Sequence, residues 1–310
     1  MVAAKSWPWL SDLDQAMLPD KAIDPVNEYD TRESVPELLN EHASNIELVK
    51  EALKEDSLYE PFKHDDLWIL RFLMSHKHKV KKATKAAKHA LQFRNKHKLD
   101  EKDLRSIAPH SVPLGEEDTP FAGCDSLKRA WITRYPGDCI AFTIPDKQRG
   151  VAGFLRFADF KHDKATMKAL SDEDLAAVFI YLSEWTFQWL DYVTRKTGRL
   201  TKSARFVDFT GFSMFQVSRD ATKRDGKIMG DMEDVYPQLL HSLFMYNQPH
   251  WIHAIWATMR HIMPSRIVEK VDMVEPKENE QEFKRLLKFV AKEHLPVSLG
   301  GDNTVNPTEW

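Results

Sequence analysis

Few side chains in this sequence could carry out chemistry, and the first to consider are histidines that could bind a metal. His250 and His253 are followed by His261, but this spacing does not match the pattern in which two histidines one helical turn apart hold zinc. His76 and His78 lie in a run of basic residues, where neighbouring positive charge disfavours a metal cation. The chain also lacks the glycine-rich nucleotide fingerprints and the Gly-x-Ser-x-Gly turn of serine hydrolases. We therefore predict no catalytic residue, no metal site, no cofactor and no enzymatic activity.

An unusually apolar helix is predicted between Pro249 and Pro264. Its apolar side chains cover more of the helix than the single stripe of a surface helix, and they are Trp251, Ile252, Ile255, Trp256, Met259, Ile262 and Met263. They fit a helix buried in the core, and they also fit a movable lid over a lipid cavity. Such a cavity must be as dry as the membrane, because each methylene group exposed to water costs about 0.8 kcal/mol. A second, aromatic-rich helix that contains Phe179, Leu182 and Trp185 is also expected to line it.

The elements that position these residues fall into two groups, and the first group is helical. Residues 1–33 contain three prolines and no sustained period, so we expect an extended acidic arm. Ser34 and Glu37 then form an expected capping box at the start of a helix with an apolar stripe. Together with two further helices, it predicts a helical module over residues 34–100. The further helices are expected at 65–75 and 79–98.

The second group alternates between strands and helices, after an irregular stretch at residues 101–145 that we expect to be a linker. The alternation predicts an α/β domain over residues 146–302 with a sheet that is at least partly parallel, and then a tail at 303–310. The longest helix has a capping-box variant at Ser171, a terminal Gly198 and apolar residues on nearly all sides, so we expect it to be buried. The expected strands lie at 151–158, 204–209, 239–246 and 268–274, and the other helices at 217–232, 251–262 and 280–292.

Length and composition place the chain among folded, soluble proteins. Its 310 residues are 42% hydrophobic and 29% charged, so it can bury one large core and a smaller module. Cys124 and Cys139 are too few for a disulfide framework, which favours a reducing compartment. The sequence begins without the apolar segment of a signal peptide, and no apolar run approaches the roughly 20 residues that span a bilayer. We therefore expect a cytoplasmic protein.

The net charge of −3 conceals a strong separation of charge along the chain. Residues 1–66 contain 16 acidic and 6 basic residues, whereas residues 67–98 contain 10 basic residues and no acidic one. A basic segment of this kind is either a solvated helix face or a docking surface for an anionic partner. The acidic arm could also fold back on it as a mask. The face that we expect to dock on anionic membrane consists of Lys79, Lys81, Lys82, Lys85 and Lys88.

Five motifs, in order along the chain, resemble those of the CRAL-TRIO lipid-binding family, which includes secretory-pathway phosphatidylinositol-transfer-like proteins. They are Asp65–Leu73 with the helix after it, Val207–Ser213 with Tyr236-Pro237, Asn247-Gln248-Pro249, Met263–Val271 and Leu295–Gly301. The resemblance covers about residues 45–302. It implies a helical N-terminal module, then a mixed sheet with flanking helices and a hydrophobic cavity closed by a gate helix. By this match, the gate helix is Trp251–Met263.

The resemblance also implies where a lipid headgroup would bind. Phosphatidylinositol-transferring members carry an Arg-Lys pair, a Glu and a Thr where this chain has His76-Lys77, Gln238 and Ile267, and they share Lys270. Because histidine is mostly neutral at pH 7, His76 lacks the permanent, forked phosphate ligand that arginine supplies. The candidates for the headgroup are therefore His76, Lys77, Gln238 and Lys270, in a degenerate phosphatidylinositol site.

The expected function is that of a lipid-binding or lipid-transfer protein that meets membranes transiently at their surface. It would hold one hydrophobic ligand, with a phospholipid as the first candidate, and exchange it at an anionic membrane. A regulatory scaffold that binds a protein partner with the same fold is the alternative, as is a carrier of another ligand such as a sterol or haem. Nucleic acid is not an expected partner, because Phe93 is the only aromatic residue among the lysines of 79–98.

Overall fold

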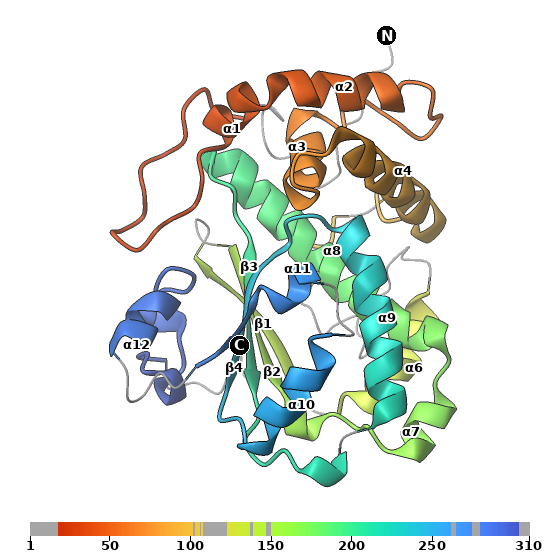
Figure 1. Ribbon diagram of the computed structural model, residues 1–310, viewed down its shortest axis with the longest axis vertical. Helices are drawn as coiled ribbons and strands as arrows, with labels where there is room; N and C mark the ends of the chain where they lie inside the picture. The colour runs from red at the N-terminus through yellow and green to blue at the C-terminus, as the bar shows by residue number, and fades with distance from the viewer. Residues whose placement is uncertain are drawn as a thin grey trace.

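The computed structural model of this chain sets a group of helices above a mixed α/β domain (Figure 1). It describes residues 18–101, 103–105, 107, 123–136, 139–146, 150–216, 218–261, 265–274 and 280–303. These residues form a five-stranded sheet in the order β1-β2-β3-β4-β5. β1 runs antiparallel to β2, whereas β2 to β5 run parallel to one another. The predicted fold, a helical module followed by a mixed sheet with flanking helices, is confirmed. Within the described chain, every helix is too short or too polar to cross a membrane.

One face of the sheet is filled by aromatic side chains. The strands are β1 (Ile140–Asp146), β2 (Gly150–Arg156), β3 (Ser203–Asp208), β4 (Leu240–Tyr246) and β5 (Val271–Met273). Alternate residues of a strand point to opposite faces. Phe154, Phe206 and Phe244 stack across three strands with ring centroids 5.0 and 5.2 Å apart. They form a closed core with the helix α12 (Glu280–Leu286) and the turns after it.

The helix α8 (Asp172–Thr197) runs through the centre of the molecule (Figure 1). The hydroxyl of Ser171 accepts a hydrogen bond from the backbone of Asp174, and the Asp174 carboxylate accepts one from the backbone of Ser171, so the predicted capping box is confirmed. Gly198 ends the helix with a φ of 64°, and a Cβ there would lie 2.9 Å from Cα of Ala22. Most residues of α8 are buried, as its apolar surface predicts.

In the described chain the N-terminal module contains α1 (Val35–Glu41), α2 (Ala43–Leu53), α3 (Asp66–Ser75) and α4 (Val80–His97). The predicted capping box at Ser34 is wrong, because its side chain makes no capping hydrogen bond. Instead, Ser34 forms an antiparallel bridge with Arg199, next to the end of α8. The single helix predicted here is divided at His42, which ends α1 and precedes α2.

Buried ion pairs join this module to α8. Arg94 of α4 donates to both carboxylate oxygens of Glu184 of α8, at 2.9 and 3.0 Å. Arg195 of α8 donates to Asp191 one turn earlier and to Asp65, the N-cap of α3, at 2.8 and 2.6 Å. All except Asp65 are buried. Removing such charges from water costs several kcal/mol per ion, so each must meet its partner for the chain to fold.

The range expected to be an irregular linker contains the helix α6 (Cys124–Arg134) and the strand β1. The expectation of irregular structure was therefore wrong for these residues. α6 packs on α8, where Arg129 donates to the Asp174 carboxylate at 2.8 Å. Pro145 obscured β1, because a proline argues against a strand unless the strand lies at an edge, which is where β1 lies.

Towards the C-terminus the predicted elements differ from those observed at their boundaries. The strand expected at 268–274 is shorter in the structure, where β5 begins at Val271 and ends at Met273. Val268 instead ends the one-turn helix α11 (Ser265–Val268), and Glu269 and Lys270 form a turn before β5. The helix expected at 280–292 ends at Leu286 as α12 and continues as 3-10 turns. The described chain also contains the helices α7 (Lys164–Ala169), α9 (Arg219–Val235) and α10 (Trp251–Met259).

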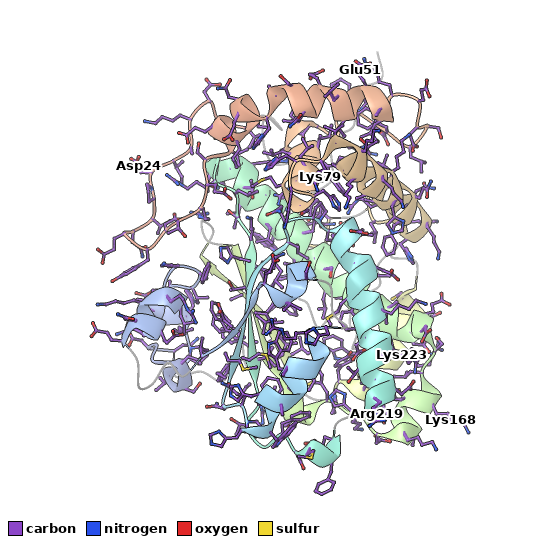
Figure 2. All side chains as sticks on the ribbon, viewed as in Figure 1. Asp24, Glu51, Lys79, Lys168, Arg219 and Lys223 are labelled. Carbon is purple, nitrogen blue, oxygen red and sulfur yellow. The ribbon has the colours of Figure 1, made fainter. Side chains whose placement is uncertain are left out.

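The described part of the N-terminal arm follows the end of α8. Ile23 donates its backbone N–H to Thr197 at 2.9 Å, and Arg199 donates its side-chain Nε to the carbonyl of Ile23 at 2.6 Å. Residues 18–33 contain no helix, as predicted. They do not lie on the basic helix α4, since Figure 2 shows Asp24 on the far side of the module from Lys79. The expected mask is therefore not formed by residues 18–33.

We expect the Arg94–Glu184 pair to be required for stability. The Glu184→Ala variant leaves a buried guanidinium without its main partner, so it should lose about 3 kcal/mol of unfolding free energy in urea titrations. Arg94→Met combined with Glu184→Leu should recover much of this loss, because neither charge of the pair is then buried. As a control, Glu60→Ala removes an exposed partner of Lys63 and should cost less than about 0.5 kcal/mol. Equal losses in the two single variants would contradict the expectation.

Candidate functional site

The second face of the sheet carries two rows of side chains beneath α10, which we call the floor. The first row consists of Leu155, Val207, Met245 and Met273 on β2 to β5. The second row consists of Gly153, Arg205, Leu243 and Val271. Leu155, Leu243, Val271 and Met273 remain partly exposed. The floor is therefore apolar apart from one arginine, and it is only partly covered.

The helix α10 lies in front of the floor, where the gate helix was predicted (Figure 1). Ile252 is buried in the cluster that contains Val207 and Met245 of the floor. The ring of Trp251 lies 5.5 Å from that of Phe212 in the same cluster. Trp256 is partly buried. The predicted cavity residues whose side chains fall outside the description are Ile255, Met259, Ile262 and Met263.

Two of the predicted motifs meet where α10 begins. Asn247 follows β4 in a left-handed conformation with a φ of 53°, which asparagine tolerates better than most residues. Its side-chain amide donates to Oδ1 of Asp208 and to Oγ1 of Thr210, both at 3.0 Å. The backbone and hydroxyl of Thr210 also donate to Asp208, at 2.9 and 2.7 Å. These bonds fix the end of β4 against the end of β3, and with it the first residue of α10.

The predicted headgroup residues lie at the opposite end of β4. His76 ends α3 as its C-cap, and Lys77 follows with a φ of 53°. Gln238 precedes β4 and donates from Nε2 to the hydroxyl of Ser75 at 3.0 Å. The structure thus brings Gln238 to the end of α3, beside His76 and Lys77. Lys270 lies next to β4 in the turn before β5. The side chain of Ile267 is outside the described residues.

This end of the sheet is rich in positive charge. The ring of His241 is partly desolvated against Phe289, and this desolvation together with the charges of Lys202, Lys270 and Lys288 lowers its pKa to about 4. His241 is therefore neutral at pH 7, while the lysines around it are charged. Such a field attracts phosphate or carboxylate groups.

The predicted cavity residues on α8 do not meet α10 in the described structure. Leu182 and Trp185 are buried, and Phe179 is partly buried, within the large cluster shared by the N-terminal module, α6, α8 and α9. The indole N–H of Trp185 donates to the carbonyl of Ile107 at 3.0 Å. The structure therefore places these three residues in the core rather than beneath α10.

The predicted docking lysines lie on the outer face of α4. Lys79, Lys81, Lys82 and Lys85 are exposed and Lys88 is partly buried. Among the described residues, none of the five forms an ion pair. Figure 2 shows Lys79 at the start of α4. The face is thus available to a partner, and its role in docking stays a prediction.

A turn beside α10 exposes two apolar side chains that the sequence analysis missed. Met214 and Phe215 lie in a 3-10 turn, Met214–Gln216, and are 55% and 99% exposed. Gln216 holds this turn, since its side chain accepts from the backbone of Ser213 at 2.8 Å and donates to the carbonyl of Ala158 at 2.9 Å. Nothing in the sequence distinguishes Phe215 from the buried aromatic residues before it, because only the turn points it outward.

We call this turn the tip, and it shares its end of the molecule with several basic side chains. Arg219 and Lys223 of α9 and Lys168 of α7 lie at the same end of the molecule (Figure 2). All three are exposed. An exposed phenylalanine among cations is a combination typical of surfaces that meet anionic membranes.

Metal chemistry finds no support in the described chain. It contains no group of three or more His, Cys, Asp or Glu side chains placed to hold an ion. His250, His253 and His261 are each exposed.

Comparison with known proteins adds a family and a fold. The model of the CRAL/TRIO domain family matches residues 137–301, so the match includes β1. Patellin-4 of Arabidopsis thaliana is 22% identical over 254 residues, which cover 79% of this chain and 39% of Patellin-4. Patellin-5 of the same plant is 24% identical over 169 residues, or 50% of this chain and 23% of Patellin-5. The chain thus spans less than half the length of either relative. The crystal structure of Sfh5 shares its fold, with a TM-score of 0.52, 12% identity, and coverage of 92% of this chain and 91% of that one.

We expect Asn247 to determine how firmly α10 is held. Asn247→Ala removes two side-chain hydrogen bonds and places alanine in a left-handed conformation, so amides 251–259 should exchange with deuterium about tenfold faster. Asn95→Ala alters an exposed asparagine of α4 and serves as the control. Unchanged exchange in α10 of the Asn247 variant would show that its contacts with the floor hold it instead.

Proposed function

The chain belongs to the CRAL/TRIO family of lipid-binding proteins, and from this premise we propose that it holds one hydrophobic ligand between the floor and α10 and exchanges it at membranes. The floor is the observation that carries the proposal. Its apolar side chains remain partly exposed on adjacent strands, and each Å² of apolar surface removed from water is worth about 25 cal/mol. An acyl chain laid along the floor would cover this surface, with the apolar side chains of α10 above it. The function is binding and transport rather than catalysis.

A phospholipid is the ligand class that we propose first, with its headgroup near His76, Lys77, Gln238 and Lys270. The approach of Gln238 to the end of α3 supports this assignment, since it gathers residues that are far apart in sequence. Lys77 and Lys270 add positive charge that suits the headgroup of an anionic lipid. His76 and Gln238 lack permanent charge, so we expect phosphatidylinositol to have no advantage over other phospholipids.

We also propose a division of the chain into parts with separate roles. Residues 18–33 of the arm and the module of 34–100 brace α8, and the lipid-binding domain takes in β1 as well as the range 146–302. The ion pairs between α4 and α8 and the pairing of β1 with β2 support this division.

Exchange requires contact with a membrane, and two surfaces are candidates for it. One is the lysine face of α4, and the other is the tip, which adjoins α10 through the contact of Phe212 with Trp251. Each Lys or Arg near an anionic surface adds about 1 kcal/mol, and burying a phenylalanine adds about 2 kcal/mol. We propose that the tip makes the apolar contact and that the α4 lysines add electrostatic attraction.

Extraction of the purified protein with organic solvent, followed by mass spectrometry, tests the function. We expect about one mole of hydrophobic ligand per mole of protein, and transfer of labelled phospholipid between vesicles. A regulatory scaffold would release no ligand and transfer none, so that outcome would exclude our proposal. A sterol or haem in the extract would keep the binding function and correct the ligand class.

Vesicle sedimentation tests the docking surface. Phe215→Ala should weaken binding to phosphatidylcholine vesicles that contain phosphatidylserine by roughly tenfold, because it removes the apolar contact. Phe62→Ala is the matched control, since Phe62 is 69% exposed but lies between α2 and α3. Arg219→Glu with Lys223→Glu should weaken binding in a salt-dependent way. If only the double variant Lys81→Glu with Lys82→Glu loses vesicle binding, the membrane contact lies on α4 rather than on the tip.

A further inference from the structure

Among the described residues, four arginines are buried and each is paired with a carboxylate, whereas the partly buried Arg205 is not. The pairs are Arg71 with Asp191 at 3.5 Å, Arg94 with Glu184 at 2.9 Å, Arg134 with Asp225 at 2.5 Å and Arg195 with Asp65 at 2.6 Å. Arg205, in the second row of the floor, has no carboxylate partner among the described residues. The described chain therefore offers the guanidinium of Arg205 no opposite charge.

The surroundings of Arg205 hold its guanidinium in place without neutralising it. Nη2 donates to the hydroxyl of Thr186 on α8 at 3.1 Å. The guanidinium carbon lies 4.4 Å from the ring centroid of Phe142, a cation–π contact. Nη1 is buried and has no hydrogen-bond partner in the described chain. A neutral hydroxyl and an aromatic face therefore take the place that a carboxylate occupies for the buried arginines.

Gly153 makes this placement possible. A Cβ at that position would lie 2.4 Å from Nη1 and 2.9 Å from Cδ of Arg205, so a side chain there would displace the guanidinium. The glycine thus leaves a gap in the second row, and the arginine side chain lies across it toward Phe142.

The positive charge of Arg205 persists at neutral pH. Burial lowers its pKa to about 9, which is low for arginine but still well above 7. A charge in an apolar environment is costly unless an opposite charge meets it. Arg205 also keeps part of its surface accessible, and its neighbour across the strands on β4 is Leu243 of the floor. The guanidinium therefore lies at the border of the surface on which we place the ligand, between Thr186 of α8 and the floor.

We propose that Arg205 binds the anionic group, a carboxylate or a phosphate, of the hydrophobic ligand. The fork of guanidinium N–H groups matches the oxygens of either anion, and a charge-assisted bond in a dry site is strong. The second row lies towards the amino ends of the strands, and the first row lies nearer to α10. The anionic group thus sits at Arg205, with the apolar chain extending over the first row towards Ile252 and the rest of a headgroup extending the other way, towards Gln238 beyond the amino end of β4. This inference rests on the proposed function and adds to it the chemical class of the ligand.

Paired probes that differ only in charge test the inference. Oleate is compared with oleyl alcohol, and phosphatidate with diacylglycerol, by equilibrium binding to ligand-free full-length protein. The wild type should prefer the anionic member of at least one pair. Arg205→Met, which keeps the apolar stem, should lose about 10- to 100-fold in affinity for that anion and change less than about threefold for its uncharged partner. Arg205→Lys should retain part of the preference.

Controls separate a binding role from a structural one. Arg156→Met removes a half-exposed arginine at the end of β2 and should leave the preference unchanged. If Arg205→Met does not fold, Gly153→Ala provides the test, because it shifts the guanidinium but keeps the charge, and it should weaken anion binding. Preference for oleate alone identifies a carboxylate ligand, and preference for phosphatidate alone a phosphate ligand. Equal binding of charged and uncharged probes overturns the role of Arg205 while lipid binding stands. Failure of the wild type to bind any probe overturns the role of Arg205, and it overturns the proposed function as well if the organic extract contains no hydrophobic ligand.

Discussion

Each acidic side chain that α8 buries must meet a cation, and this requirement arranges the helices around it. Glu184 forms an ion pair with Arg94 of α4, and Asp174 forms one with Arg129 of α6. The Arg195 side chain of α8 reaches out to Asp65 at the start of α3. Apolar packing alone would tolerate several positions of these helices, because the hydrophobic effect has no direction. The buried ion pairs each have one geometry, so they fix the N-terminal module and α6 on the central helix.

The helices arranged around α8 cover only part of the sheet. The face with Phe154, Phe206 and Phe244 is closed by α12, while the other face is covered at one end by α8 and lies beneath α10 at the other. The floor lies between the areas that α8 and α10 cover. Its side chains are mostly apolar, and several of them are not fully covered by other residues. α10 is tied firmly where it begins, through Asn247 and Asp208, whereas its described contacts with the floor are few. A helix that is anchored at one end and rests on an apolar surface is suited to cover a ligand.

The sequence predicted those features that depend on local residues. The capping box at Ser171 and the terminal Gly198 of α8 depend on neighbours in the chain, and both were predicted correctly. The same signal failed at Ser34, because a tertiary bridge to Arg199 took the place of the cap. Arg205 could not be identified as part of a site, since its neighbours Gly153 and Leu243 become known only from the register of the strands. Likewise, the exposure of Phe215 depends on a turn held by Gln216, which no periodicity reveals.

The contrast between the paired arginines and Arg205 indicates how a bound ligand would be sensed. The paired arginines meet carboxylates of the protein itself, so their contribution to its stability does not depend on a ligand. Arg205 is joined to α8 by a single neutral hydrogen bond to Thr186, two residues after Glu184. An anion bound at Arg205 would neutralise the guanidinium charge on the floor. It would also strengthen the link between the floor and α8, the helix that holds the N-terminal module. By the same reasoning, an anionic ligand at Arg205 supplies the opposite charge that the described chain does not, so its binding should stabilise the whole fold rather than the floor alone.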